Sequence, residues 1–488
     1  MISLKALFKS SLIYAIGTAL MRIMTFLLLP LYTNILDADG NFWYGNFVLV
    51  VTSIAFLRIC YSHGVGDGFL KLYSESKNKK EIISTYLTYI LIMITCISGV
   101  IWFINSIVPQ QGADSLMGLL QSQMKYIVLI VMCDTLNFRI IDILRIKNNA
   151  LYYMLGQICG VVATLYLSIH YVKNELMGLE GALLALLYGG LVTFIIFIPV
   201  LIQNLNFSLF SKSQLHKLVN LGIRFFPAAI FFMFMTLLDR YLLKFLLESP
   251  IDNPEYVNNL IGTYSVGAKL ASIPLFMINA FNLGWQPFYL SNGNTAEAHK
   301  RYESVGTIFI IFTLSISWFV GIVIPVIANL NLPIGNIPLI GKTYSGFNEI
   351  IPIMLLSHVF YALYIIHMPS IYLCNKQNWS PIFRVCGAST NVLLNIILIP
   401  MYEIKGAAIA TALSYGIMFL FLFYKNRNWM PIKINWQDII LLMILVSISI
   451  ICFIGKLNIQ YYLIVGTLIY IIYLIYKHGM KNLISLFK

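Results

Sequence analysis

The chain has 488 residues, of which 59% are hydrophobic and only 10% are charged, and its formal net charge is +13. A soluble globular protein carries roughly 25% charged residues, so this composition, with a mean hydropathy of +0.82, excludes that class. Apolar runs of about 20 residues, the length that crosses a hydrocarbon core of ~30 Å, recur from end to end. The runs are continuous, whereas the strands of a membrane β-barrel would alternate. We therefore predict an all-α polytopic membrane protein.

The excess of basic residues does not indicate a nucleic-acid-binding protein, because the bases are spread over short loops, as the positive-inside rule expects of a membrane protein. The seven Cys residues form no CxxC pair, and the seven His residues show no HExxH spacing. We therefore predict no disulfide framework, no resident metal and no cofactor. Whether the protein uses a coupling ion, Na⁺ or H⁺, is left open.

Fourteen transmembrane spans are expected, centred near residues 22, 54, 94, 135, 161, 191, 234, 273, 316, 362, 390, 413, 446 and 468. The first span has full spanning length with no small-residue cleavage site after it, so no cleavable signal peptide is expected. One alternate set of loops carries 21 Lys and Arg residues and the opposite set only 5. Both termini are therefore predicted to be cytoplasmic. No loop is longer than about 20 residues, which excludes a separate soluble domain.

Two pairs of segments suggest an internal duplication. Residues 149–189 and 378–416 both run from an Asn through a span with a central Gly and a short outer loop to Gly-Ala. Residues 44–54 are similar to 261–273 in the same order, and the offsets are about 217 to 227 residues. The alternative is chance similarity between apolar sequences.

The duplication predicts three parts of the chain. Residues 1–205 and 206–427 would each form a six-helix lobe, and residues 428–488 would add two further transmembrane helices. A duplicated helical bundle with a site between its halves is typical of transporters.

Several bases lie inside the predicted spans. Arg22 is about 18 Å from the cytoplasmic end of the first span, and Lys269 about 15 Å from the outer end of the eighth. Arg58 lies deep in the second span, although it could also extend toward the cytoplasmic face. A lipid-facing base at such depth costs at least ~2.5–3.5 kcal/mol. We therefore expect these three to line a cationic cavity, the alternative being pairing with a carboxylate.

The fourth span carries charges of both signs. Arg139–Asp142 and Asp142–Arg145 have the i,i+3 spacing of local ion pairs, so a structural role is favoured for them. Asp134 is kept as a candidate proton or cation site.

The run MTLLDRYLLKFLL (235–247) places three charges near the outer end of the seventh span. Arg240 lies about 26 Å along this span from its start at Ile223, close to the boundary of the hydrocarbon core. Arg240 is expected to line the outer mouth as a substrate contact or to anchor the interface. Lys244 is expected to snorkel, and Asp239 to meet a base on another span.

Four stretches in this order carry a family resemblance: LGIRFFPAAIFFMFMTLLDRYLLKFLL, GTYSVGAKLASI, GWQPFYLS and GASTNVLLNIILIPMYEIKGAAIATALSYG. With GVGDGFLKLYSESK near the second span, they resemble the polysaccharide-biosynthesis (O-antigen, Wzx-type) oligosaccharide flippases. These belong to the multidrug/oligosaccharidyl-lipid/polysaccharide exporter superfamily. Asp67 and Lys71 depart from the pattern, since relatives often show Arg and less acid there.

The resemblance implies a MATE-like fold with twelve core helices in two lobes. It also implies a multi-pass protein of the bacterial cytoplasmic (inner) membrane that exports a polyprenyl-pyrophosphate-linked oligosaccharide for a surface polysaccharide such as O-antigen or capsule. Flippases of this kind are thought to use a cation-lined cavity, matched here by Arg22, Arg58 and Lys269. Expected partners are the lipid-linked glycan, membrane lipids, and a polysaccharide polymerase with its chain-length machinery.

Two other functions are weighed against this transporter, which is not expected to be an enzyme. A cation-coupled multidrug exporter of the same superfamily would be expected to embed more acids than bases, whereas Arg22 and Lys269 favour an anionic substrate. A polytopic glycosyltransferase or polymerase could use Asp37 and Asp39 as its paired catalytic acids. The run DADGN is rich in turn-forming residues, however, so an acidic turn is favoured. The large outer catalytic loop that such enzymes usually carry is not evident in the sequence.

Overall fold

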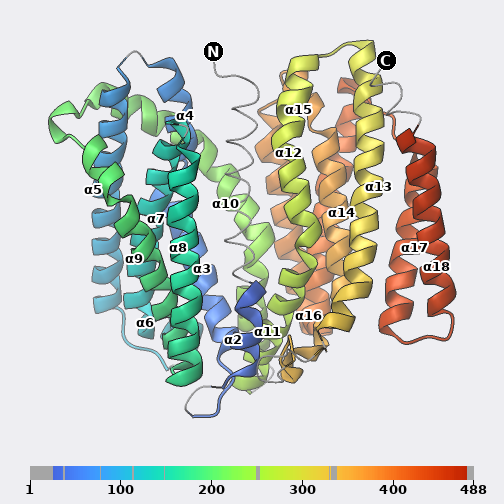
Figure 1. Ribbon diagram of the computed structural model, residues 1–488, viewed down its shortest axis with the longest axis horizontal. Helices are drawn as coiled ribbons and strands as arrows, with labels where there is room; N and C mark the ends of the chain where they lie inside the picture. The colour runs from blue at the N-terminus through green and yellow to red at the C-terminus, as the bar shows by residue number, and fades with distance from the viewer. Residues whose placement is uncertain are drawn as a thin grey trace. The chain divides into compact units, whose positions relative to one another are not determined.

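The computed structural model describes residues 26–36, 39–76, 78–112, 115–147, 149–248, 253–328, 330 and 338–480. These residues form helices joined by turns, with no β-strand among them (Figure 1). The α-helices are α2 (Leu29–Asn34), α3 (Tyr44–Ser62), α4 (Val65–Glu75), α5 (Lys79–Ile107), α6 (Leu116–Ser122), α7 (Met124–Ile146), α8 (Ala150–Ser168), α9 (Gly178–Asn204), α10 (Lys212–Glu248), α11 (Pro254–Ala271), α12 (Ile273–Asn292), α13 (Ala296–Ile327), α14 (Ile351–His367), α15 (Pro369–Leu373), α16 (Trp379–Trp429), α17 (Trp436–Ile454) and α18 (Gln460–Ile475). The predicted all-α class is confirmed.

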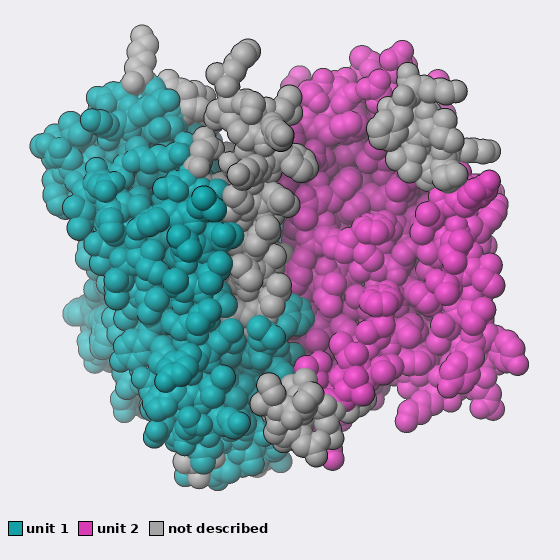
Figure 2. All heavy atoms as spheres, in the orientation of Figure 1, with its two compact units in different colours: residues 1–233, 251–262 teal, residues 234–250, 263–488 magenta. Residues whose placement is uncertain are grey.

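The chain divides into two compact units, coloured separately in Figure 2. Unit 1 holds residues 1–233 and 251–262, and unit 2 holds residues 234–250 and 263–488. The helices α10 and α11 therefore each contribute to both units. The predicted boundaries at 205/206 and 427/428 stay predictions.

Nine of the described helices are long and apolar enough to cross a membrane, and eleven are if the bent helix α10 and the bent pair α11–α12 each count as one span. The predicted count of fourteen stays a prediction, and most of the first span lies outside the described residues. Helix α7 has 23 residues and is long enough to cross a membrane, but it is not one of these nine. It carries the charged residues of the fourth predicted span. Helix α16 has 51 residues, which at 1.5 Å per residue is long enough for two spans.

A sharp turn divides α16 into two antiparallel halves. Glu403 has non-helical backbone angles there, φ 48° and ψ −125°. The rings of Trp379 and Trp429, at the two ends of α16, lie 5.6 Å apart. A Cβ on Gly406 would lie 2.2 Å from the carbonyl oxygen of Leu398, so only glycine allows the two halves to meet so closely. The two spans predicted near residues 390 and 413 therefore form one hairpin.

Unit 1 contains a matching hairpin made of α8 and α9, which supports the predicted duplication. Its turn has a residue with positive φ, Leu176 at 52°, which lies 403 − 176 = 227 residues before Glu403. A Cβ on Gly181, in the same Gly-Ala position as Gly406, would lie 2.9 Å from the Cβ of Met177. The two hairpins thus share both the strained turn and the close-packed glycine after it.

Small residues set the packing of α8 against α9. A Cβ on Gly160 would lie 1.9 Å from the hydroxyl of Thr193, and a Cβ on Gly189 would lie 1.8 Å from that of Thr164. Both threonine side chains are buried. Since apolar side chains gain little by leaving lipid, close contact at such Gly–Thr pairs is what holds membrane helices together.

Candidate functional site

The deep base of unit 1 lies beside an acid. Arg58 of α3 approaches Asp134 of α7, with 4.0 Å between Nη1 and Oδ2, and the two side chains are 39% and 32% exposed. The Arg58 guanidinium also lies 4.8 Å from the ring centre of Phe138. Asp134, the predicted proton or cation site, is therefore the nearby counter-charge of Arg58. Because both side chains are part-exposed, the pair is accessible as well as partnered.

A second charged cluster in unit 1 is largely buried and connected by hydrogen bonds. Arg139 and Asp142 lie 3.2 Å apart on α7 in the expected i,i+3 geometry. Tyr86 of α5 donates to Asp142 at 2.7 Å and accepts from Arg139 at 2.9 Å, and its ring stacks on Phe69 of α4 at 4.1 Å. Arg145 is exposed, so its predicted pairing with Asp142 is not formed. This cluster joins three helices, which indicates a structural role.

In unit 2, the buried acid is held by neutral donors, and the prediction that it meets a base on another span was wrong. Asp239 is 1% exposed. Its carboxylate accepts from Tyr264 of α11 at 2.5 Å and from Asn395 and Thr411 of α16, each at 2.9 Å. Asn391 lies in the same cluster, because its side-chain oxygen accepts from Asn395 at 3.0 Å.

The two bases that follow Asp239 in the sequence, Arg240 and Lys244, lie in different surroundings. Arg240 donates to the carbonyl of Thr236 at 2.5 Å and lies 5.3 Å from the ring centre of Tyr264. Lys244 was expected to snorkel, but its side chain is only 1% exposed and pairs with Glu248 at 3.6 Å. Lys244 is thus packed inside the unit, because the face of α10 that carries it points into the protein rather than to the interface.

Lys269 lies near the end of α11, next to a break in the helix. Its carbonyl accepts from the Ser272 hydroxyl at 2.6 Å, and α11 and α12 meet there at 45°. Its side chain is half-buried, and within the part of the chain that the structure describes its ammonium forms no ion pair. Of the other candidates, Arg22 and Asp37 lie outside the described residues, as do the side chains of Asp67 and Lys71.

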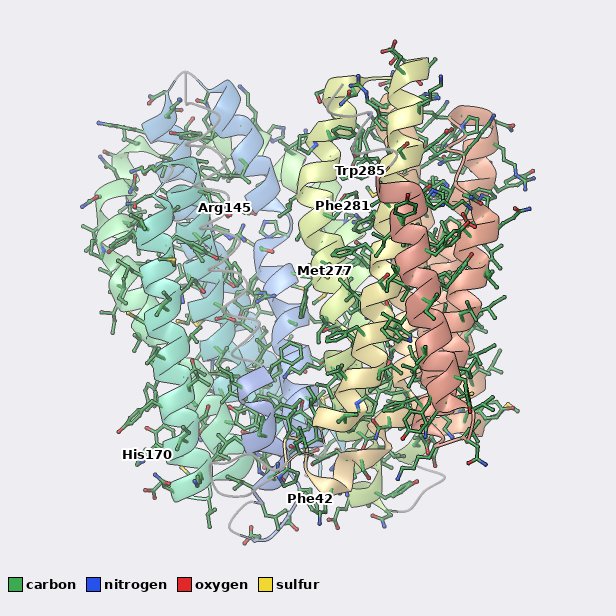
Figure 3. All side chains as sticks on the ribbon, turned by 45° about the vertical axis from the view of Figure 1, so that its right-hand side comes forward. Phe42, Arg145, His170, Met277, Phe281 and Trp285 are labelled. Carbon is green, nitrogen blue, oxygen red and sulfur yellow. The ribbon has the colours of Figure 1, made fainter. Side chains whose placement is uncertain are left out.

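The GWQPFYLS stretch that carried part of the family resemblance places two buried rings, Trp285 and Tyr289, in the core of unit 2. Met277, Phe281 and Trp285 follow one another along α12 (Figure 3). Phe281 stacks on Phe309 of α13 at 3.7 Å, and the buried indole of Trp285 donates to the carbonyl of Ile365 at 3.2 Å. These aromatic residues position α12 against α13 and α14.

The functional residues that sequence reasoning missed are the partners of Asp239. Asn391 and Asn395 are fully buried and spaced i,i+4 within an apolar span. This spacing puts two amides on one face of a transmembrane helix, where a polar group needs a partner, and that signal was present in the sequence. No group of three His, Cys, Asp or Glu residues that could hold a metal ion occurs within the described residues.

Long apolar helices, buried ionisable residues and a similar hairpin in each unit are the features of a multi-pass membrane protein with a transporter fold. Residues 7–288 match the family described as "Polysaccharide biosynthesis protein". Because the match covers more than half of the chain, the protein belongs to this family. No curated protein matches the chain in sequence.

Solved structures of similar fold cover nearly the whole chain. The lipid II flippase MurJ in an inward closed conformation is 15% identical with a TM-score of 0.62, over 98% of this chain and 100% of that one. A multidrug resistance MATE transporter in an outward-facing conformation is 14% identical with a TM-score of 0.58, over 87% and 95%. A Vibrio cholerae MATE transporter is 12% identical with a TM-score of 0.54, over 87% and 96%. The predicted MATE-like fold is confirmed.

Proposed function

We propose that this protein is a flippase that moves a polyprenyl-pyrophosphate-linked oligosaccharide across the bacterial cytoplasmic membrane by alternating access, for the assembly of a surface polysaccharide. Membership of the polysaccharide biosynthesis family and a fold similar to that of a lipid II flippase support this assignment. The observation that carries it is Lys269, a half-buried base in a membrane span with no ion pair among the described residues. A base kept in this setting needs an anionic partner.

A diphosphate headgroup supplies such a partner. Crossing the bilayer requires positive counter-charge for its phosphates, and Lys and Arg provide point and forked donors to phosphate. In unit 2 this role falls to Lys269, with Arg240 as a further contact. In unit 1 it falls to Arg58, which is 39% exposed beside Asp134. Arg22 is the fourth candidate from the sequence.

Asp239 is proposed as the coupling site. Its carboxylate is buried, and its three partners, Tyr264, Asn395 and Thr411, are all neutral. The side-chain oxygen of Asn395 is buried and accepts no hydrogen bond within the described part of unit 2. A buried carboxylate is stabilised by taking up a proton or a hard cation, and hard cations bind carboxylate, amide and hydroxyl oxygens. The cluster offers these three kinds of oxygen to H⁺ or Na⁺.

The second candidate is a cation-coupled multidrug exporter, which the likeness to MATE transporters and the buried Asp239 favour. The two candidates differ in the charge of the substrate. An organic cation would be repelled by Lys269, whereas a pyrophosphate would be attracted to it. A glycosyltransferase that uses Asp37 and Asp39 is a third candidate, and Asp37→Asn tests it, since loss of glycan transfer by the purified protein would support an enzyme.

The experiment that tests the flippase is deletion of the gene with analysis of the lipid-linked glycan. We expect the polyprenyl-pyrophosphate-linked repeat unit to accumulate and the surface polysaccharide to be lost, with both defects restored by the intact gene. Proteoliposomes that hold the purified protein should then expose the labelled lipid-linked oligosaccharide on the opposite leaflet. Unchanged surface polysaccharide together with reduced dye efflux would instead identify a drug exporter.

A further inference from the structure

A cavity of about 240 Å³ lies within unit 2, where α14 and α16 end and α17 begins. Its walls are aromatic and aliphatic, from Phe423, Trp436 and Ile434. Two bases, Arg427 and Lys433, also line the cavity, and no carboxylate does so among the described residues. None of these residues belongs to the proposed transport machinery. The cavity therefore combines an apolar interior with a net positive lining.

Both bases are available to a ligand. Their side chains are exposed, and neither forms an ion pair with a carboxylate of the described residues. Arg427 lies 5.6 Å from the ring centre of Phe423, which orients its guanidinium. The backbone N–H of Lys433 donates to Glu303 of α13 at 3.1 Å, so the connector that carries Lys433 is fixed to a neighbouring helix.

Tryptophan residues near the cavity indicate that it lies at the level of the lipid headgroups. Trp379 and Trp429 mark the two ends of α16, and Trp436 marks the start of α17. Tryptophan collects at the membrane–water interface. Lys425, one turn before the end of α16, lies 4.5 Å from the ring centre of Trp379. The distribution of bases among the loops predicts that this interface is the cytoplasmic one, where anionic lipids attract basic residues.

A buried imidazole lies in the wall of the cavity. His367, at the end of α14, is 0% exposed and lines the cavity. Its Nδ1 lies 2.8 Å from the carbonyl of Leu363, and because a carbonyl only accepts, Nδ1 carries the proton. In the neutral ring Nε2 is then an acceptor, and it has no partner within the described residues. Because the ring is 0% exposed, this nitrogen is enclosed by protein, and recognition of a ligand falls to the exposed bases and the aromatic rings.

We propose that this cavity binds the headgroup of an anionic phospholipid from the cytoplasmic leaflet. The phosphodiester is held between Arg427 and Lys433, and the glycerol portion rests against Phe423 and Trp436. Basic pockets between transmembrane helices on the cytoplasmic side take headgroups of this kind. Zwitterionic lipids are disfavoured, because their headgroups carry no net negative charge to match Arg427 and Lys433.

The test measures binding of phosphatidylglycerol to the full-length protein in detergent, by native mass spectrometry and by the lipid-dependent rise in melting temperature. Phosphatidylcholine and inorganic phosphate are compared at equal concentrations. The double variant Arg427→Gln/Lys433→Gln should bind phosphatidylglycerol about thirty-fold more weakly, the effect of two bases at a bilayer surface. Each single variant should bind phosphatidylglycerol about fivefold more weakly. The single variants therefore still test the proposal if the double variant does not fold.

The matched control is Lys212→Gln/Lys217→Gln, which removes the same charge from two exposed residues of α10 in unit 1. It should bind phosphatidylglycerol as the unchanged protein does. Equal losses in the control and the cavity variant would show attraction to overall charge and overturn the proposal. Equal binding of phosphatidylcholine, or of phosphate alone, would overturn it as well. Because the readout is lipid binding, it is independent of whether the protein flips a glycan.

Discussion

Asp239 of α10 accepts a hydrogen bond of 2.9 Å from the side-chain amide of Asn395 on α16, and both side chains are buried. If this carboxylate takes up the coupling ion, replacing it with the neutral amide in Asp239→Asn should leave the fold intact and abolish ion dependence. For Na⁺, the melting temperature of the unchanged protein should rise in NaCl relative to choline chloride at equal ionic strength. For H⁺, it should rise as the pH is lowered. The variant should show neither response.

The control for Asp239→Asn is Glu297→Gln, which removes an exposed carboxylate at the start of α13. It should keep the full ion response. Transport by Asp239→Asn that still follows an imposed Na⁺ or proton gradient would rule out Asp239 as the coupling site. It would leave the flippase assignment in place, because substrate recognition is assigned to other residues.

Lys269 is predicted to act through its charge. Lys269→Arg should retain transport of the lipid-linked oligosaccharide, whereas Lys269→Gln should lower the initial rate about tenfold or more, since a hydrogen bond to a charged group is worth ~1.5–3 kcal/mol. The measurement is the appearance of labelled substrate on the opposite leaflet of proteoliposomes. Lys173→Gln, at an exposed position after α8, should transport normally. Unaltered transport by Lys269→Gln would remove Lys269 from the substrate site.

The clusters around Asp142 and Asp239 show how far local spacing predicts a charged site. Arg139 and Asp142 are three residues apart on one helix, so their pairing follows from helix geometry alone. The donors to Asp239 are different, because Asn395 and Thr411 are 156 and 172 residues away in the chain. Only the packing of α10 against α16 brings them together, and no local period encodes that packing.

Lys244 shows a second limit of sequence reasoning. Counting residues along a span estimates depth, and on that basis Lys244 was expected at the interface. Depth along the axis does not say which side of the helix faces lipid, however, and the side that carries Lys244 is buried. The spans themselves were easier to predict, since nine of the described helices between α3 and α18 are apolar runs long enough to cross a membrane.

Tyr86 is predicted to stabilise unit 1 through its hydroxyl. Tyr86→Phe keeps the ring that stacks on Phe69 but removes the bonds to Asp142 and Arg139. Leaving buried charged groups short of a partner should lower the free energy of unfolding by about 1–3 kcal/mol. Denaturation of the purified protein in micelles measures this change. Tyr166→Phe, at a side chain that is 71% exposed, should have no comparable effect, and equal stability of the two variants would contradict the structural role of the cluster.

Gly45 is predicted to be irreplaceable for the packing of α3 in unit 1. A Cβ at this position would lie 2.1 Å from the carbonyl oxygen of Asn258 on α11 and 2.8 Å from its carbonyl carbon. These are backbone atoms that cannot rotate away, so Gly45→Ala must separate the two helices, and such overpacking costs about 1–3 kcal/mol or more. The variant should melt at a lower temperature than the unchanged protein. Gly99→Ala in α5, where a Cβ would meet nothing within 4 Å, should be neutral or slightly stabilising, because alanine favours the helix. A Gly45→Ala protein as stable as Gly99→Ala would show that α3 and α11 do not approach this closely.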